Sequence, residues 1–215
     1  MTNYLATLTA VAALFAGACS AADTPAAPKP ATTPPATAAP APAAAKAATG
    51  AHFTQAAGSG SLAFSFQQAG AENQGSFKQF ATDLNYDPKN PAAGSLKVTV
   101  QTASLDTQDK DRNDLLAGAD LFDVKRYPTA QYLANSFAKR ADGQLEAVGK
   151  LTLRGVTKDL RVPLAIHETA NGVEISGAVT LKRLDFGVGQ GDWQSTEGVG
   201  NDVKLQYKVP LTRAK

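Results

Sequence analysis

Residues 145–166 read LEAVGKLTLRGVTKDLRVPLAI and hold two runs in which apolar and polar side chains alternate. A period of two is typical of a β-strand that buries one face. Gly155 lies between the runs, and a glycine at such a break is typical of a tight turn. Pro163 removes one backbone donor from the second run, which indicates a bulge or a weak pairing there. The stretch therefore predicts an antiparallel hairpin.

The same alternation recurs along the chain after residue 61 and predicts eight strands. They fall at residues 62–66, 80–86, 96–100, around Tyr132, 145–153, 160–166, 175–181 and 203–211. The dipeptides Asp142-Gly143 and Asn171-Gly172 tolerate positive φ and predict two further hairpins. Eight antiparallel strands close into a barrel just wide enough to fill with side chains or to hold one ligand. The sequence thus predicts an all-β, eight-stranded antiparallel barrel.

Two breaks in phase interrupt the alternation. Phe77 is opposite in parity to Phe80, and Phe137 is opposite in parity to Tyr132. A bulge or a sharp bend restores the buried face after such a break, and barrels need these features to close. We therefore expect a bulge or a bend at both places.

One stretch has the pattern of a helix. Residues 111–117 (DRNDLLA) carry acids early and are followed by Gly118, which predicts a short helix that ends there. With residues 121–130 (LFDVKRYPTA) it forms the one long connection between strands. We expect this connection to cover one end of the barrel.

The N-terminal residues 1–18 have the pattern of an export signal, with an apolar run at 5–18 that is too short to anchor the chain across a bilayer. Two interpretations of the cleavage site remain open. An ordinary signal peptidase cleaves after Ala18, or the segment before Cys19 is a lipobox and Cys19 becomes the lipidated first residue. The lone cysteine before a proline-rich spacer favours a membrane-anchored lipoprotein of the periplasm. Ser20 resembles the enterobacterial sorting signal for the outer membrane.

The domain division follows from composition. Residues 19–51 are dominated by Ala, Pro and Thr and contain no aromatic side chain. Such a segment cannot bury enough surface to offset its ordering entropy, so it predicts a disordered tether. Residues 52–215 remain as one domain of ordinary size.

The chain offers little of what catalysis or metal binding needs. Its two histidines are His52 and His167, and its one cysteine precedes the domain. Glycines at 187, 189 and 191 follow a strand, but no helical pattern comes after them, so a dinucleotide-binding fingerprint lacks its context. The acids between residues 106 and 120 lack the bidentate glutamate that ends an EF-hand loop. The sequence predicts no catalytic residue, no metal site and no enzyme.

Charge argues against nucleic acid as a partner. The net charge is only +2, and Lys and Arg are scattered along the chain rather than clustered. The oligomeric state stays open, with a homodimer as one alternative.

Several short motifs occur in the order and spacing of a known family. They are NYDP at 85–88, SLDT at 104–107, LFDVKRYP at 121–128, GKLTLRGVTK at 149–158 and RLDFGVG at 183–189. Through them, residues 52–215 resemble the YceI-like lipid- and polyisoprenoid-binding proteins. The string GQGDW at 189–193 resembles a subgroup associated with cytochrome b561-type membrane proteins.

The resemblance implies a lipocalin-like barrel with an elongated apolar cavity. It also implies a periplasmic protein that binds an isoprenoid chain, such as a quinone or a polyprenyl lipid, and uses no cofactor beyond that lipid. The alternative is a structural or stress-related surface lipoprotein whose barrel is filled by side chains and holds no ligand. Catalysis would instead need a polar cleft with perturbed acids.

The inward phases of the strands give the expected cavity lining, although plain core packing is the alternative for each residue. The expected wall residues are Phe64, Phe66, Phe80, Leu84, Val98, Val100, Tyr132, Leu151, Leu153, Val179 and Leu181. The expected residues of the mouth are Leu116, Phe122, Phe186 and Trp193.

Overall fold

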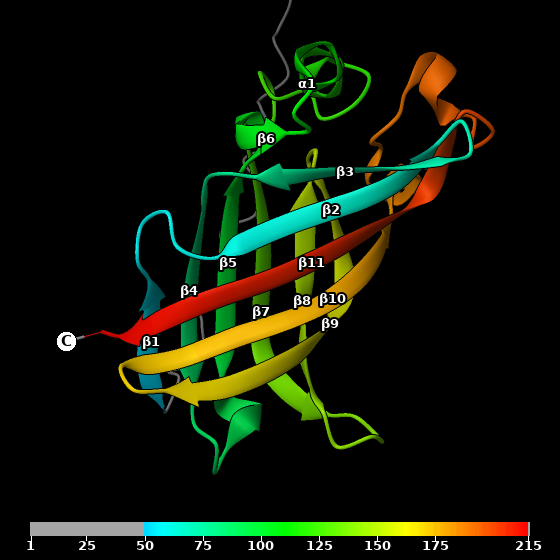
Figure 1. Cartoon of the computed structure of the whole chain (residues 1–215). Helices are drawn as coiled ribbons and strands as arrows, with labels where there is room; N and C mark the ends of the chain where they lie inside the picture. Colours follow the sequence, from blue (N-terminus) through cyan, green and yellow to red (C-terminus); the bar gives the residue numbers. More distant parts are fainter. Residues whose placement is uncertain (1–49, 215) are drawn as a thin grey trace, which may run out of the picture. The chain divides into compact units, whose positions relative to one another are not determined.

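A computed structural model of the chain describes residues 50–214, which form an all-β domain with one α-helix (Figure 1). The strands are β1 (Ala51–Gln55), β2 (Ser61–Gln68), β3 (Ala71–Phe77), β4 (Phe80–Tyr86), β5 (Ser95–Gln101), β6 (Leu105–Asp106), β7 (Thr129–Lys139), β8 (Leu145–Leu153), β9 (Val156–Thr169), β10 (Gly172–Lys182) and β11 (Val199–Arg213). The helices are α1 (Lys110–Ala117) and the 3-10 helices η1 (Pro91–Ala93), η2 (Thr102–Ser104), η3 (Arg183–Phe186) and η4 (Gly191–Gln194).

The predicted export signal, Cys19 and the tether up to residue 49 lie outside the described residues. The first strand, β1, begins at Ala51, the last residue of the predicted tether.

Eight strands close the barrel, as predicted. They follow one another in the order β1, β4, β5, β7, β8, β9, β10 and β11, and the ring is completed by antiparallel pairing between β1 and β11. Two strands pair with different parts of β11 along the same side. β2 pairs with Val203–Lys208 of β11, and β1 pairs with Leu211–Arg213 of β11. β1 and β2 thus follow one another along the same edge of β11. β3 pairs with the other edge of β2, and β6 pairs with β3.

The hairpin of residues 145–166 is confirmed. β8 and β9 are joined by Arg154 and Gly155, both with left-handed φ, at 49° and 74°. Two such residues form the turn that matches the twist of an antiparallel pair. Pro163 pairs opposite Glu146 of β8, whereas the ladder between β9 and β10 begins only at Ala165. The weak pairing predicted around Pro163 is therefore found on the β10 side.

The two breaks in phase have different causes. Between Tyr132 and Phe137 the register of β7 shifts at a bulge, so both side chains are buried on the inner face. Between Phe77 and Phe80 the chain bends at Lys78, so the expected bend is found, but it separates two strands rather than bending one. Phe77 ends β3 and Phe80 begins β4, so the two residues belong to separate strands with a turn between them.

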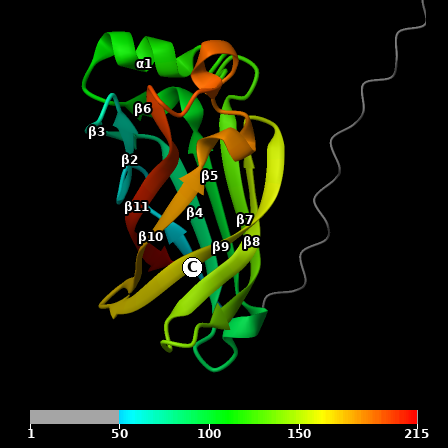
Figure 2. The ribbon, with the colours of Figure 1, turned by 90° about the vertical axis from the view of Figure 1, so that its right-hand side faces the viewer.

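The two ends of the barrel differ. At one end, called the filled end, large side chains pack into a core that includes Phe53, Leu84 and Phe137. At the other end, called the covered end, α1 and the loop that carries η3 and η4 lie over the barrel (Figure 2). The predicted long connection therefore does cover a barrel end. Its helix begins at Lys110, where the side chain of Asp109 accepts a hydrogen bond from the Arg112 backbone.

Candidate ligand-binding cavity

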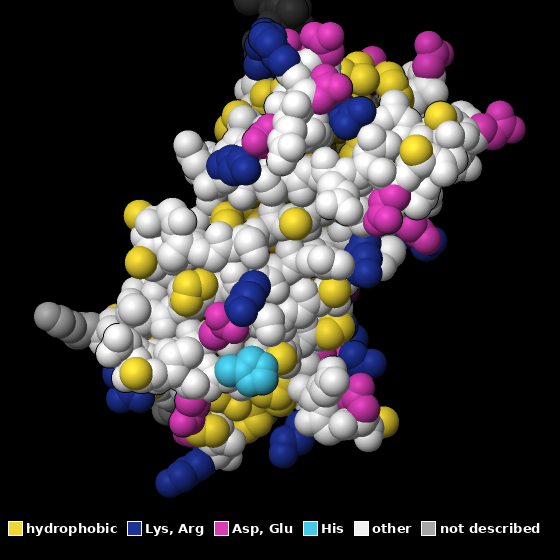
Figure 3. All heavy atoms as spheres, in the orientation of Figure 1, with side chains coloured by type: hydrophobic (Ala, Val, Ile, Leu, Met, Phe, Trp, Pro, Cys, Tyr) yellow, Lys and Arg dark blue, Asp and Glu magenta, His cyan; other side chains and the backbone are white. Residues whose placement is uncertain are grey.

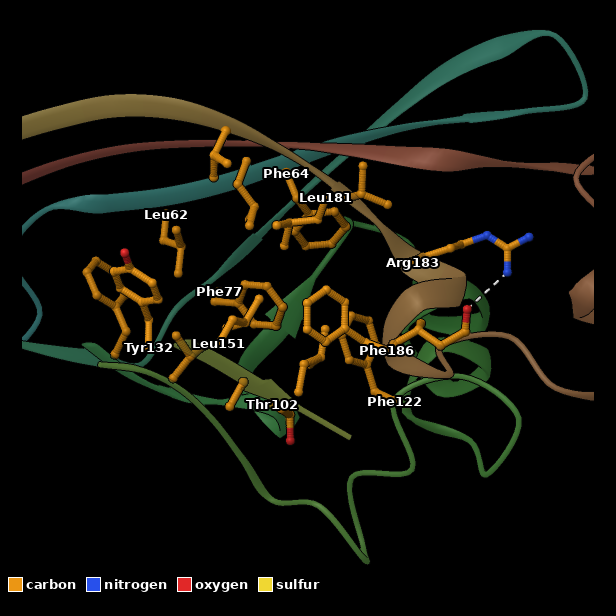
Figure 4. Close-up of a pocket in the computed structure, with 18 of the residues that line it drawn as sticks. Leu62, Phe64, Phe77, Thr102, Phe122, Tyr132, Leu151, Leu181, Arg183 and Phe186 are labelled. Atoms are coloured by element: carbon orange, nitrogen blue, oxygen red, sulfur yellow. Dashed lines mark hydrogen bonds between the residues drawn. The ribbon is translucent and has the colours of Figure 1, made fainter. Parts of the chain in front are cut away.

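A cavity of about 220 Å³ lies inside the barrel between the filled and covered ends. Its wall is almost entirely aliphatic and aromatic, and Figure 4 shows side chains from opposite walls pointing toward one another. Two charged side chains contribute to the lining, those of Arg112 and Arg183. The described barrel is thus hollow at one end and packed at the other.

The structure places all but one of the expected lining residues around this cavity. They are Phe64, Phe66, Phe80, Val98, Val100, Leu116, Phe122, Tyr132, Leu151, Leu153, Val179, Leu181, Phe186 and Trp193. Leu84 is the exception and corrects the expectation. It is fully buried in the core of the filled end, opposite Phe53 of β1 and Leu96 of β5. The strand phase correctly predicted that Leu84 points into the barrel. Its depth along the barrel decides whether it borders the cavity or the packed core.

Other lining residues were missed although their signal was present. The inner phase of β11 supplies Val203, Leu205, Tyr207 and Val209. The alternation of these residues had predicted a strand, and the same phase contained the lining. Leu121 and Val188 were missed for a different reason, because they come from connections in which no strand period indicates direction.

Aromatic rings form one wall of the cavity. The Phe64 and Phe77 ring centroids are 5.3 Å apart, and those of Phe77 and Phe122 are 6.0 Å apart in an edge-on arrangement. Gly75 pairs directly opposite Phe64, and a Cβ there would lie 2.4 Å from the Phe64 ring. The Phe64 ring can therefore pack against β3 only because residue 75 has no side chain.

Two tyrosines lie in the wall with their hydroxyls bonded to backbone carbonyls. The Tyr132 hydroxyl lies 2.9 Å from the Ala147 carbonyl oxygen, and the Tyr207 hydroxyl donates to the Pro163 carbonyl. Burial raises the pKa of both tyrosines well above the ordinary value. Both hydroxyls are therefore neutral and occupied as donors.

Arg183 organises the covered end. Its side chain is buried and points away from the apolar lining (Figure 4). Its guanidinium donates five hydrogen bonds of 2.6–3.0 Å, all to backbone carbonyls. The acceptors are Val188, Trp193, Ser195, Val199 and Gly200. Every N–H of the side chain is thus satisfied, and segment 188–200 is folded around one cation.

The three sequence motifs around residues 121–130, 149–158 and 183–191 meet at the covered end. The backbone amides of Gly189 and Gln190 donate to the Asp120 carbonyl at 2.9 and 2.8 Å. Arg154, in the β8–β9 turn, donates to the Ala119 carbonyl at 2.6 Å. Leu121, Phe186 and Val188 pack into a small apolar cluster beneath these bonds. Motifs far apart in sequence thus build one cover.

Residues 50–214 contain no group of three or more His, Cys, Asp or Glu side chains arranged to hold a metal ion. No helix in that part of the chain is long and apolar enough to cross a membrane. Charged side chains of both signs are interspersed over the face in Figure 3.

A closed antiparallel barrel with an apolar interior has the architecture of barrels that are wide enough for one small ligand. The chain belongs to the YceI-like domain family, whose family model matches residues 53–211.

Named relatives agree with this assignment. A UPF0312 protein of Pseudomonas putida is 30% identical over 142 residues, which cover 61% of this chain and 71% of the relative. Protein YceI of Escherichia coli O157:H7 is 34% identical over 122 residues, covering 53% of this chain and 62% of the relative.

Solved structures share the fold. The crystal structure of Burkholderia cenocepacia BcnA superimposes with a TM-score of 0.67 and 31% identity, over 70% of this chain and 94% of that one. A polyisoprenoid binding domain from Saccharophagus degradans superimposes with a TM-score of 0.60 over 77% of this chain and all of that one. Its identity is 14%, so it supports the fold alone.

Proposed function

We propose that this protein binds a long-chain apolar lipid of the isoprenoid type within the barrel and carries or stores it. The observation that carries the proposal is the cavity of about 220 Å³ with its aliphatic and aromatic wall. Burial of a hydrocarbon chain contributes about 0.8 kcal/mol for each CH₂ group removed from water. A chain can therefore be held without polar specificity along its length, once the cost of ordering it is offset.

The size of the cavity bears on how such a chain is held. Sites for drug-sized ligands measure roughly 300–1,000 Å³, so this cavity is smaller than a long isoprenoid chain requires. The chain must extend into the covered end, where Phe122 and Trp193 are only half-buried and Leu115 is exposed. We expect binding to move side chains of this end rather than those of the closely packed filled end.

A protein of the same fold suggests the ligand class. The Saccharophagus degradans domain with the same fold is described as polyisoprenoid binding. A quinone or polyprenyl lipid is the specific form of the proposal for this chain. No catalytic step is proposed.

Location and partners extend the proposal. Residues 1–19 favour a periplasmic lipoprotein anchored through Cys19, and Ser20 favours the outer membrane as its location. The resemblance of residues 189–193 supports a cytochrome b561-type membrane protein as a partner. A homodimer is a further state to be tested.

Analysis of the bound lipid tests the central proposal. The full-length protein is purified from membranes, extracted with organic solvent and analysed by mass spectrometry. We expect an isoprenoid lipid in the extract and binding of added quinone by the lipid-free protein. A clean extract together with no quinone binding would instead favour a barrel that serves only as a surface lipoprotein.

A further inference from the structure

Thr82 carries a polar atom in the cavity wall that has no hydrogen-bond partner among the described residues. Its side chain lines the cavity, the residue is only 4% exposed, and its hydroxyl oxygen is buried and unbonded. A buried hydroxyl without a partner costs about 1–3 kcal/mol, so such groups usually have a reason. The other buried threonine of the lining, Thr102, donates to the Tyr127 carbonyl at 2.8 Å. Thr82 is therefore different from its neighbours.

Along β4, Thr82 is the last residue toward the filled end that lines the cavity. It lies in β4 between Phe80, which lines the cavity, and Leu84, which is fully buried in the core of the filled end. Across the sheet it pairs with Val98, and Val98 pairs with Tyr132. These three residues lie side by side on neighbouring strands, toward the filled end, and we call this row the floor.

No charged group is available at the floor. The charged side chains of the lining are Arg112 of α1 and Arg183 of η3, and both elements lie at the covered end. All five N–H groups of Arg183 are already bonded to carbonyls. Burying an unpaired carboxylate at the floor would be very costly, whereas an uncharged polar group needs only one partner. A hydroxyl serves as both donor and acceptor, so it suits an alcohol, an amide or a quinone carbonyl.

We infer that Thr82 binds the uncharged polar end of the lipid, which lies at the floor while its hydrocarbon chain runs toward the covered end. This inference rests on the proposed lipid binding and adds an orientation and a ligand class to it. The ligand is a long-chain amphiphile with a neutral hydrogen-bonding end, bound polar end first. A charged fatty acid is disfavoured because its carboxylate would meet no cation at the floor.

Substitution of Thr82 tests the hydrogen bond. Thr82→Val keeps the shape of the side chain and removes the hydroxyl, and Thr82→Ser keeps the hydroxyl. We expect Thr82→Val to weaken binding of hexadecanol about tenfold, which corresponds to about 1.4 kcal/mol. Binding of hexadecane should change by less than about twofold, and Thr82→Ser should retain most of the affinity for hexadecanol.

The outcomes separate this inference from the function on which it rests. Because Thr82→Val removes an unsatisfied group, its thermal midpoint should equal or exceed that of the wild type, and this checks that the variant is folded. Unchanged hexadecanol affinity in a folded Thr82→Val variant would overturn the role of Thr82. Failure of the wild type to bind hexadecanol, hexadecane or a quinone would overturn lipid binding itself.

The single tryptophan of the chain reports the orientation. Trp193 lies in the cavity lining and packs against the apolar cluster of the covered end. Bromine quenches tryptophan fluorescence only at close range. Hexadecanol with bromine on the carbon farthest from the hydroxyl should therefore quench Trp193 more strongly than hexadecanol with bromine beside the hydroxyl-bearing carbon. Stronger quenching by the second probe would show the reverse orientation and overturn the inference.

Discussion

Arg183 and Gly189 occupy adjoining space so closely that a Cβ at position 189 would lie 2.0 Å from Nη1 of Arg183. Gly189 also has a φ of 116°, a conformation that other residues rarely adopt. The glycine and the arginine therefore depend on each other: the backbone passes over the guanidinium only where no side chain intervenes. This pair fixes segment 188–200, and with it the position of Trp193 at the covered end.

Gly189→Ala should unfold segment 188–200 locally. The added methyl group must displace Arg183 or the backbone, and we expect a loss of about 2–4 kcal/mol in the free energy of unfolding. Gly191→Ala is the matched control, because Gly191 also has a positive φ, 54°, but a Cβ there would meet nothing within 4 Å. Chemical denaturation of both variants gives the comparison. Equal losses would show that backbone strain, and not the contact with Arg183, decides the effect.

Arg183→Lys should loosen the same segment while keeping the charge. Lysine has three donors on one nitrogen and cannot reach five carbonyls in a planar arrangement. We expect a loss of about 2–4 kcal/mol in unfolding free energy and a red shift of Trp193 emission as its ring becomes exposed. The neighbouring Lys182→Ala is the control: Lys182 forms an exposed ion pair with Asp202 at 3.0 Å, worth less than about 1 kcal/mol. An unshifted emission spectrum in Arg183→Lys would contradict the organising role of Arg183.

The barrel could be predicted from sequence because its strands bury one face. The runs at 145–153 and 160–166 alternate so regularly that the hairpin and its turn at Gly155 were evident. β3, with the sequence AENQGSF, was missed because none of its residues is fully buried and no apolar period indicates a strand. β1 was missed for lack of length, since its five residues place only Phe53 in the core.

The cavity was harder to predict than the barrel. Thr82 and Leu84 share one phase of β4, yet only Thr82 lines the cavity and Leu84 fills the core. The phase of a strand predicts whether a side chain points into the barrel. Whether the barrel is hollow or filled at that depth depends on the side chains that other strands contribute there. Arg183 lay within a recognised motif, but five acceptors from segment 188–200 give it its role, and no spacing rule indicates them.

Stability at alkaline pH should depend on the buried tyrosines. Burial raises the pKa of Tyr132 and of Tyr207 in the folded protein above the unfolded value of about 10. A raised folded pKa gives stability that is fully present below the unfolded pKa and is lost as the pH rises toward the folded one. We expect the unfolding free energy to fall above about pH 10, by up to about 1.4 kcal/mol per pH unit for each tyrosine.

Tyr132→Phe combined with Tyr207→Phe isolates this effect. The double variant loses two hydroxyl hydrogen bonds and should be less stable at neutral pH, but its stability should fall less steeply above pH 10. Urea denaturation at a series of pH values measures both quantities. Parallel curves for the wild type and the double variant would mean that other groups cause the alkaline loss.

Cys19→Ala tests the membrane anchor. If Cys19 is the lipidated residue, the variant should move from the membrane fraction to the soluble periplasmic fraction, because the acyl chains that hold it are absent. Fractionation with immunodetection measures the distribution, and mass spectrometry of the N-terminal peptide of the wild type identifies the modification. Ser20→Ala is the control, since it leaves the acylated cysteine in place. Membrane association of Cys19→Ala equal to that of the wild type would favour ordinary signal cleavage.

Val98→Phe tests whether the hollow part of the barrel holds the ligand. Val98 lines the cavity in β5, and the larger ring would occupy volume that a lipid chain needs. In a filled core such an enlargement costs about 1–3 kcal/mol, whereas an open cavity accepts it with little loss of stability. We therefore expect Val98→Phe to lower the amount of co-purified lipid at least about fivefold while its thermal midpoint stays near that of the wild type.

Thr99→Phe provides the control, because residue 99 is adjacent in the same strand and its side chain lies on the opposite face of the sheet. It should retain the wild-type content of lipid. A large fall in stability for Val98→Phe would indicate that the barrel is packed at this level. Unchanged lipid content in a stable Val98→Phe would place the ligand outside the cavity, because a chain that lies against Val98 cannot share that volume with a phenylalanine ring.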